Sequence, residues 1–229
     1  MFDNLRYSRN RELISTTEQE KLANFTVAVV GLGGLGGHIS EQLSRLGIGK
    51  LILVDADKVD DSNLNRQIFA TEKNIGQFKA EAAKARLTNI NSNVEYNCRV
   101  EYFDETNAEK ILSGVDIVVD AVDNISSRFL LQKVCKNLKI PFVHGSIGGW
   151  YGQVSFILPG DDTLNLIYPD DNVVGVENNL GNPAFTPALI ASIEVAEVLK
   201  YLLNKGELLH NKMLFVDLLQ HDYMIIKLK

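Results

Sequence analysis

Short apolar runs alternate with longer amphipathic segments from residue 26 to residue 145. The apolar runs are typical of buried strands, and we expect them at residues 27–30, 51–54, 94–100, 116–120 and 142–144. The segments between them have helical spacing of apolar residues, which predicts helices at 35–46, 77–91, 105–112 and 126–138. Regular alternation of this kind favours an α/β, Rossmann-like fold, with a mostly parallel sheet and helices on both faces.

The pattern differs before and after this region. Residues 1–25 are polar, and the sequence from Thr16 to Glu20 resembles a capped helix start, which predicts an N-terminal helical arm. Residues 146–229 begin with a glycine-rich turn and an alternating strand, and end with a predicted helix and two further strands. These C-terminal elements predict an antiparallel β extension, at residues 148–152 (turn), 153–158 (strand), 187–203 (helix), 213–217 and 223–228 (strands).

A loop rich in Asp, Asn, Gly and Pro is expected at residues 159–187. It is acidic and long, and the sequence leaves open whether it closes over a site. No internal repeat or linker interrupts the chain, so we expect a single domain over 1–229, with its nucleotide-binding core at 26–145.

The first strand leads into a glycine-rich turn in front of the first helix. Glycine allows positive φ and has no Cβ, so the N–H groups at the helix start can approach a phosphate. The second strand ends at Asp55, where a carboxylate suits a ribose hydroxyl. These features predict a nucleotide-binding βαβ unit. The candidate phosphate contacts in the turn are Gly31, Gly33, Gly34, Leu35 and Gly36.

A polar and cationic segment after Asp55 changes the nucleotide that we expect. It reads Ser62-Asn63-Leu64-Asn65-Arg66-Gln67, and Lys79 follows it. The glycine turn and Asp55 alone also permit an NAD-dependent oxidoreductase or an inactive nucleotide-binding scaffold. A dinucleotide has little need for two cations at this point, whereas a triphosphate does, so Arg66 and Lys79 favour ATP.

Composition and charge exclude several classes of protein. The 229 residues are 45% hydrophobic and carry a net charge of −6 that is spread along the sequence, so we do not expect nucleic acid as the main partner. No apolar run has the length of a membrane span. Two cysteines, Cys98 and Cys135, cannot form a disulfide framework and are typical of a reducing cytoplasm.

Six sequence elements together resemble the adenylating family that includes the molybdopterin-synthase adenylyltransferase MoeB, the thiamine-biosynthesis adenylyltransferase ThiF and HesA, which shares an ancestral fold with ubiquitin-activating enzymes. They agree with the family in order and spacing. The elements are Arg6-Tyr7-Ser8-Arg9, Gly31–Gly36, Asp55-Ala56-Asp57, Ser62–Gln67, Gly76-Gln77-Phe78-Lys79-Ala80 and Asp120-Ala121-Val122-Asp123-Asn124.

The resemblance implies an ATP- and Mg²⁺-dependent reaction and a role for individual residues. Asn63, Arg66 and Lys79 are expected to contact the phosphates, and Asp123 to bind Mg²⁺. Arg9 is expected to cross a homodimer interface to the partner's ATP, and with Arg66, Lys79 and Asp123 it forms the expected catalytic set. The remaining expected nucleotide contacts are Asp57, Gln67 and Asn124.

Several of these residues also have simpler interpretations. Asp57 is equally suited to a local cap or turn, Asp123 to a helix N-cap, and Arg9 to a surface salt bridge. His144 follows a strand and is expected to be packed or hydrogen-bonded rather than catalytic.

The cysteine content departs from the family pattern. Many members hold Zn²⁺ with two Cys-x-x-Cys pairs, which this chain lacks, so we expect no zinc. Members that form a thioester carry a cysteine in the loop that corresponds to residues 158–187, which contains none. Cys135 is expected to be a small packed hydrophobic residue. The reaction is therefore expected to stop at the acyl-adenylate or to pass it to another molecule.

The function that the resemblance implies is activation of a C-terminal carboxylate by adenylation, with a small ubiquitin-fold sulfur carrier ending in Gly-Gly as the substrate. The alternatives are adenylation of a peptide or of a tRNA-linked threonylcarbamoyl group, and the acidic charge argues against the tRNA.

Overall fold

The computed structural model describes residues 5–168 and 180–228. Its strands are β1 Thr26–Val30, β2 Lys50–Val54, β3 Glu95–Arg99, β4 Ile117–Asp120, β5 Phe142–Gly148, β6 Tyr151–Ile157, β7 Lys212–Asp217 and β8 Asp222–Lys227. Its helices are η1 Leu5–Asn10, α1 Thr16–Leu22, α2 Gly34–Leu46, η2 Asp61–Asn63, α3 Lys79–Ile90, α4 Ala108–Leu112, α5 Ile125–Leu138, α6 Thr163–Ile167 and α8 Phe185–Leu203.

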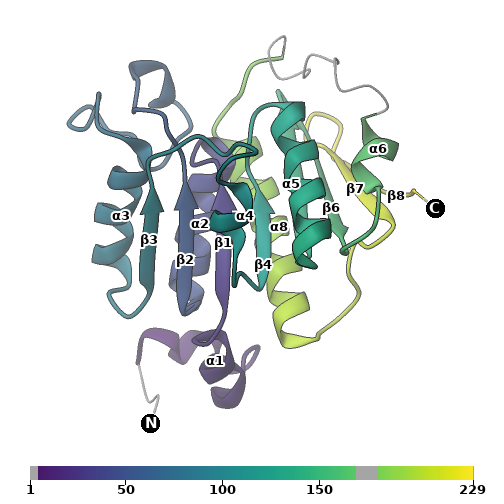
Figure 1. The fold of residues 1–229 in the computed structure, drawn as a ribbon, viewed down its shortest axis with the longest axis horizontal. Coiled ribbons are helices and arrows are strands. Elements are labelled where there is room, and N and C mark those ends of the chain that lie inside the picture. Colours follow the sequence, from purple (N-terminus) through teal and green to yellow (C-terminus); the bar gives the residue numbers. More distant parts are fainter. Residues whose placement is uncertain (1–4, 169–179, 229) are drawn as a thin grey trace.

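All eight strands belong to one sheet with the order β3-β2-β1-β4-β5-β6-β7-β8 (Figure 1). Strands β1 to β5 pair in parallel, and β5 to β8 pair antiparallel, so β5 belongs to both halves. The predicted fold, a Rossmann-like parallel sheet with a C-terminal antiparallel extension, is confirmed. The structure shifts most element boundaries by one to four residues and extends the strand expected at 142–144 to Gly148.

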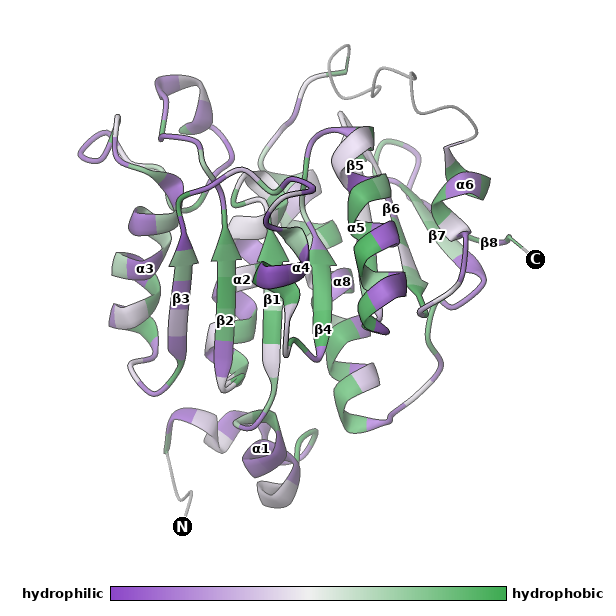
Figure 2. Cartoon of the chain, in the orientation of Figure 1, coloured by the Kyte–Doolittle hydropathy of each residue, from purple (hydrophilic) through white to green (hydrophobic). Residues whose placement is uncertain are grey.

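Helices cover both faces of the sheet (Figure 1). The side chains of α2, α3 and α8 form one core layer, and those of α4, α5 and α6 form the other. Strand β1 supplies both layers, because successive side chains point to opposite faces: Val27 and Val29 face the first layer, Ala28 and Val30 the second. This two-sided burial explains why β1, β2 and β4 are mostly hydrophobic along their length (Figure 2).

The N-terminal arm consists of η1 and α1 and lies at the amino ends of the parallel strands (Figure 1). Ser15 and Glu18 form a capping box at the start of α1, as the polar pattern predicts. Tyr7 is buried, and its hydroxyl accepts a hydrogen bond from Asn91 Nδ2 at 2.9 Å. The arm is therefore fixed to the end of the sheet opposite to the start of α2.

The prediction of one continuous loop at residues 159–187 was wrong at both ends. Residues Thr163–Ile167 form α6, which is held by a hydrogen bond from the Leu164 N–H to Gln132 Oε1 on α5 at 2.9 Å. Helix α8 begins at Phe185. The acidic residues of this segment between 169 and 179 lie outside the described residues. In residues 5–168 and 180–228, no helix has both the length and the apolar character needed to cross a bilayer.

Candidate nucleotide-binding site

A cavity of about 500 Å³ opens at the carboxyl ends of the parallel strands. The neighbouring strands β1 and β4 lead in opposite directions along the sheet, β1 to β2 and β4 to β5, and ligands of open α/β sheets bind at such a point. The cavity brings together twelve of the predicted site residues: Gly31, Gly33, Gly34, Leu35, Asp55, Asp57, Asn63, Arg66, Gln67, Lys79, Asp123 and Asn124.

The glycines of the β1–α2 turn have two different roles. Gly31 has φ of 92°, and a Cβ at Gly36 would overlap the Gly31 carbonyl, so the backbone of the turn itself requires these two glycines. Gly33 and Gly34 line the cavity instead, and a Cβ on Gly33 would have no atom nearer than Gln67 Nε2 at 3.7 Å. Gly33 is the N-cap of α2 and supplies no side-chain cap, so the first N–H groups of α2 are available to an anion.

Asp55 is fixed at the end of β2 by two backbone groups. Its Oδ2 accepts a hydrogen bond from the Leu32 N–H at 2.7 Å, and its Oδ1 accepts one from the Asp57 N–H at 2.8 Å. Burial raises the pKa of the Asp55 carboxyl, and the nearby Lys79 ammonium partly opposes this. Each carboxylate oxygen retains a second lone pair, so the position remains suitable for a ribose hydroxyl.

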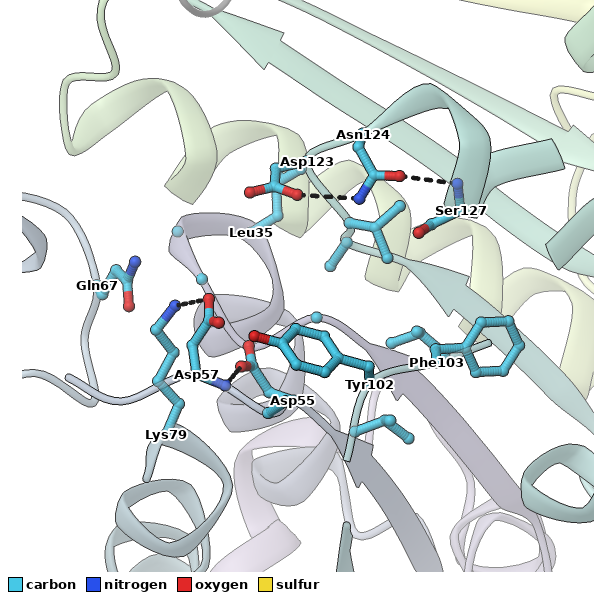
Figure 3. A pocket seen from close by; sticks show the side chains of 18 of the residues that line it. Leu35, Asp55, Asp57, Gln67, Lys79, Tyr102, Phe103, Asp123, Asn124 and Ser127 are labelled. Carbon is cyan, nitrogen blue, oxygen red and sulfur yellow. Dashed lines mark hydrogen bonds and ion pairs between the residues drawn. The ribbon is translucent and has the colours of Figure 1, made fainter. Parts of the chain in front are cut away.

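Lys79 and Asp57 form an ion pair on the cavity wall (Figure 3). Lys79 Nζ lies 2.9 Å from Asp57 Oδ2, and the side chains are 9% and 52% exposed respectively. The Lys79 N–H also donates to the Asp57 carbonyl at 2.9 Å. Asp57 therefore holds the first residue of α3 through both its backbone and its side chain. The polar end of a largely buried lysine is kept at the cavity in this way.

The Ser62–Gln67 segment begins with η2 and folds back on itself. Asn63 Oδ1 accepts the Asp60 N–H at 3.1 Å in a capping box. Arg66 Nη1 donates to the Ser62 carbonyl at 3.0 Å and to Asn65 Oδ1 at 2.8 Å. Asn63 and Arg66 both line the cavity, and the Arg66 side chain lies beside Gly34, where an added Cβ would be 3.7 Å from Arg66 Cδ.

Asp123 and Asn124 lie on the opposite side of the cavity from Lys79 (Figure 3). Asn124 is the N-cap of α5, because its Oδ1 accepts the Ser127 N–H at 2.8 Å. The alternative interpretation of Asp123 as the helix cap is therefore wrong. Asp123 is exposed, and its Oδ1 accepts only a long bond of 3.3 Å from Asn124 Nδ2 among the described residues. Mg²⁺ in proteins is commonly held by one or two carboxylates together with substrate phosphates, so this carboxylate fits such an ion.

Two predicted site residues do not line the cavity. Gly36 lies under the turn, in the role given above. Arg9 lies in η1, at the amino ends of the strands, and is exposed. The N-terminal arm, which includes this residue, lies at the amino ends of the strands (Figure 1), whereas the cavity is lined by residues at their carboxyl ends, so any contact between Arg9 and a bound nucleotide requires a second chain.

Other lining residues were missed from sequence. Tyr102 and Phe103 follow β3, the neighbour of β2, and their position after a parallel strand was the available signal. Asn182 lies in the segment before α8, and its carbonyl accepts a bond from Asn65 Nδ2 at 3.0 Å. Arg128 lies in α5, and no sequence signal distinguished it from an ordinary helical cation.

The remaining predictions concern His144 and the cysteines. His144 is fully buried, with Nδ1 2.7 Å from Asp120 Oδ2, so its interpretation as a hydrogen-bonded side chain is confirmed. Cys135 lies on α5 and packs in the core, as expected. Burial raises the pKa of Cys98 to about 11 and of Cys135 to about 12. The described residues contain no group of three or more His, Cys, Asp or Glu placed to hold a metal.

Comparison with known proteins shows extended similarity in sequence. Residues 7–229 match the ThiF family. The chain is 34% identical over 217 residues to a SAMP-activating enzyme E1 of Haloferax volcanii, covering 93% of this chain and 80% of that protein. It is 34% identical over 221 residues to the adenylyltransferase and sulfurtransferase MOCS3 of Drosophila yakuba, covering 94% of this chain but only 49% of that protein.

Solved structures show the same fold. E. coli MccB aligns with a TM-score of 0.84 at 24% identity, over 99% of this chain and 70% of that one. A structure of E. coli MccB with ATP aligns with a TM-score of 0.78 at 25% identity, over 99% of this chain and 72% of that one. Since the family match includes all but the first six residues, the chain belongs to the ThiF family, the adenylyltransferase family that its motifs resemble.

Proposed function

We propose that this chain uses ATP to adenylate the C-terminal carboxylate of a small ubiquitin-fold sulfur-carrier protein that ends in Gly-Gly. One observation carries the proposal: a single cavity combines an open helix N-terminus, a fixed carboxylate, two cations and an exposed carboxylate. The similarity to a SAMP-activating enzyme E1 and to an adenylyltransferase named MOCS3 supports the reaction class and suggests this kind of acceptor. We expect the reaction in the cytoplasm.

The chemistry assigns a task to each side of the cavity. The carrier carboxylate attacks the α-phosphorus of ATP, an acyl–phosphate bond forms, and the bond to the β-phosphate breaks, so pyrophosphate leaves with the bonding electrons. Negative charge grows on the leaving group, and Lys79 and Arg66 are the cations that would stabilise it. The N–H groups that open α2 would bind a phosphate, and Asp55 a ribose hydroxyl.

Asp123 is the proposed ligand for Mg²⁺, which supplies Lewis-acid stabilisation of the phosphoryl oxygens when bound. The exposed carboxylate has one long internal hydrogen bond among the described residues, so binding an ion costs little internal bonding. Asn124 supports it by capping α5 and by donating to its Oδ1.

The sequence lacks the cysteine needed for a thioester in the 158–187 loop, and burial raises the pKa of both cysteines that it has. A thiol with a raised pKa is a poor nucleophile at neutral pH. We therefore expect the product to remain an acyl-adenylate until another molecule accepts the acyl group.

Arg9 is proposed to complete the partner's site in a homodimer. Mixing Arg9→Ala subunits with Asp123→Asn subunits tests this, because each variant alone should be inactive. In a mixed C₂ dimer one site would carry both defects and the other neither, so about half of the wild-type activity per dimer should return. If mixing restores nothing, Arg9 does not act across the interface.

Pyrophosphate exchange tests the reaction class. Labelled pyrophosphate should enter ATP only with Mg²⁺ and with a carrier whose C-terminal carboxylate is free; the matched control is the same carrier with a C-terminal amide. A carboxyl-terminated peptide and a threonylcarbamoyl-tRNA serve as alternative acceptors, and exchange with either one alone would reassign the substrate. Tight binding of NAD without binding of ATP, measured by calorimetry, would instead favour an oxidoreductase.

A further inference from the structure

The turn between β4 and α5, which carries Asp123, is held by side chains that lie beneath it. Asp120 ends β4 and is fully buried, and its Oδ1 accepts the Val122 N–H at 3.1 Å. Arg128 is 3% exposed, and its Nη2 donates to the Val122 carbonyl at 3.0 Å. Both polar groups of the residue before Asp123 are therefore bound by buried charged side chains.

The two charged side chains also contact each other. Arg128 Nε lies 3.6 Å from Asp120 Oδ2, and that same oxygen lies 2.7 Å from His144 Nδ1. On the other side of the guanidinium, Nη1 lies 3.3 Å from the Tyr168 hydroxyl. The planar guanidinium thus connects Asp120, Val122 and Tyr168 at fixed angles, which a lysine ammonium cannot reproduce.

Burial of this ion pair is costly for a structural role alone. Removing a carboxylate and a guanidinium from water costs free energy that their attraction often does not fully return, and apolar packing frequently replaces such pairs without loss of stability. The benefit that a buried pair offers is a defined geometry. Here the pair fixes the backbone of Val122, the residue that precedes Asp123, the proposed metal ligand.

We infer that Asp120 and Arg128 are positioning residues that fix the Asp123 carboxylate for Mg²⁺ and ATP, an inference that rests on the proposed function of the cavity. Asn124 fixes the turn on the other side of Asp123 through its cap on α5. With Val122 and Asn124 both held, the backbone of Asp123 has little freedom, although its side chain is exposed. A carboxylate fixed in this way loses less entropy when it binds an ion.

The test replaces the guanidinium without removing its charge. Arg128→Lys keeps a cation beside Asp120, but a single ammonium cannot bind Asp120 and the Val122 carbonyl with the same geometry. We expect the rate of pyrophosphate exchange to fall between about 10- and 100-fold, as displacements of about 1 Å at a reactive group do. Calorimetry at increasing Mg²⁺ concentrations measures how Mg²⁺ improves the affinity for ATP. We expect the Mg²⁺ concentration at which half of this improvement is reached to rise several-fold in Arg128→Lys.

Gln132→Met is the matched control. Gln132 lies one turn further along α5, is 7% exposed, and bonds Leu164 and Asn165 rather than the turn. The Gln132→Met variant should lower the melting temperature without changing the Mg²⁺ concentration that ATP binding requires. If Gln132→Met raises the Mg²⁺ requirement as much as Arg128→Lys does, the effect is general loosening of α5 and the inference is wrong.

The Asp123→Asn background separates positioning from direct contact with ATP. If Arg128 acts through Asp123, then Arg128→Lys should cause no further loss of exchange once Asp123 is Asn. Additive losses would mean that Arg128 acts independently of Asp123, and would overturn the inference. Wild-type exchange in Asp123→Asn alone would remove Asp123 from the mechanism and overturn the inference as well. No exchange in the wild-type protein with any acceptor would instead contradict the proposed function, so the two failures are distinguishable.

Discussion

Two clusters of ionisable side chains lie at the carboxyl edge of the sheet, and they differ in their access to solvent. The cavity cluster, Asp55, Asp57, Lys79 and Asp123, lines the 500 Å³ cavity. The buried cluster, Asp120, His144 and Arg128, lies directly beneath, with exposed fractions between 0% and 3%. The side chains of the cavity cluster line the open cavity, whereas those of the buried cluster are almost completely shielded from solvent, and among these three only Arg128 also reaches the cavity wall.

The hydrogen-bond and ion-pair partners of these side chains show which cluster is free to bind a ligand. The cavity cluster includes an exposed Asp123 and the half-exposed side of the Lys79–Asp57 pair, which a phosphate or an ion can reach. In the buried cluster the side chains of Asp120, His144 and Arg128 are bound by other protein groups, so a substrate could use them only by replacing those bonds. We therefore assign ATP and Mg²⁺ binding to the cavity cluster, and the positioning of the turn that carries Asp123 to the buried cluster.

Stability measurements should separate the clusters most strongly. Asp120→Asn breaks a buried ion pair and should lower the free energy of unfolding by about 3–5 kcal/mol. Asp57→Asn breaks a pair whose carboxylate is 52% exposed, and should cost at most about 1 kcal/mol. Urea denaturation of both variants measures this. Equal losses would show that the two clusters do not differ as described.

Loss of the exposed carboxylate in the cavity cluster should instead reduce activity strongly and stability little. Asp123→Asn keeps the size of the side chain and removes the proposed metal ligand, so pyrophosphate exchange should fall at least about 10²-fold while ATP still binds. Its melting temperature should stay close to wild type, because Asp123 is exposed and, within the described residues, its side chain accepts one long hydrogen bond, from Asn124. Glu105→Gln, which changes an exposed carboxylate paired with Lys133 away from the cavity, is the control and should leave exchange unchanged. Unchanged exchange in Asp123→Asn would remove this residue from the mechanism.

A smaller effect is expected from Glu194, a buried carboxyl on the other face of the sheet. Glu194 lies on α8 against Gly145 of β5, and neither of its oxygens has a hydrogen-bond partner among the described residues. Burial raises the pKa of Glu194 well above its usual 4.5, with a further rise from Asp120 and an opposing effect from Arg128. The folded state thus keeps a proton that the unfolded state releases, and stability falls as pH rises above the usual carboxyl range.

Glu194→Gln should remove this penalty. We expect a rise in melting temperature of at least about 2 °C at pH 7 that shrinks toward pH 4. The control is Glu197→Gln on the same helix: Glu197 is 2% exposed but accepts the Leu209 N–H at 2.7 Å and pairs with Lys200, so this variant should be less stable than wild type. A pH-independent change in Glu194→Gln would contradict the assigned protonation.

The sequence was sufficient to predict the cavity cluster but not the buried cluster. Gly31, Asp55 and Lys79 lie at strand or helix ends, where a local pattern determines both the backbone and the side-chain position. Asp120 and His144 meet only because β4 and β5 pair in the register that sets these two residues side by side, which no local pattern specifies. The role of Arg128 depends on the rotation of α5 over that pair, and α6 was missed because its five residues lie in a polar segment.

The source of one oxygen atom in AMP tests the central claim most directly. A carrier labelled with ¹⁸O in its C-terminal carboxylate is incubated with the protein, ATP and Mg²⁺, and hydroxylamine then attacks the acyl carbon, so AMP leaves with the bridging oxygen. The account predicts AMP that carries one carboxylate-derived ¹⁸O, together with pyrophosphate and carrier hydroxamate in equal amounts. Unlabelled AMP, or ADP and phosphate as the products, would contradict adenylation at this cavity.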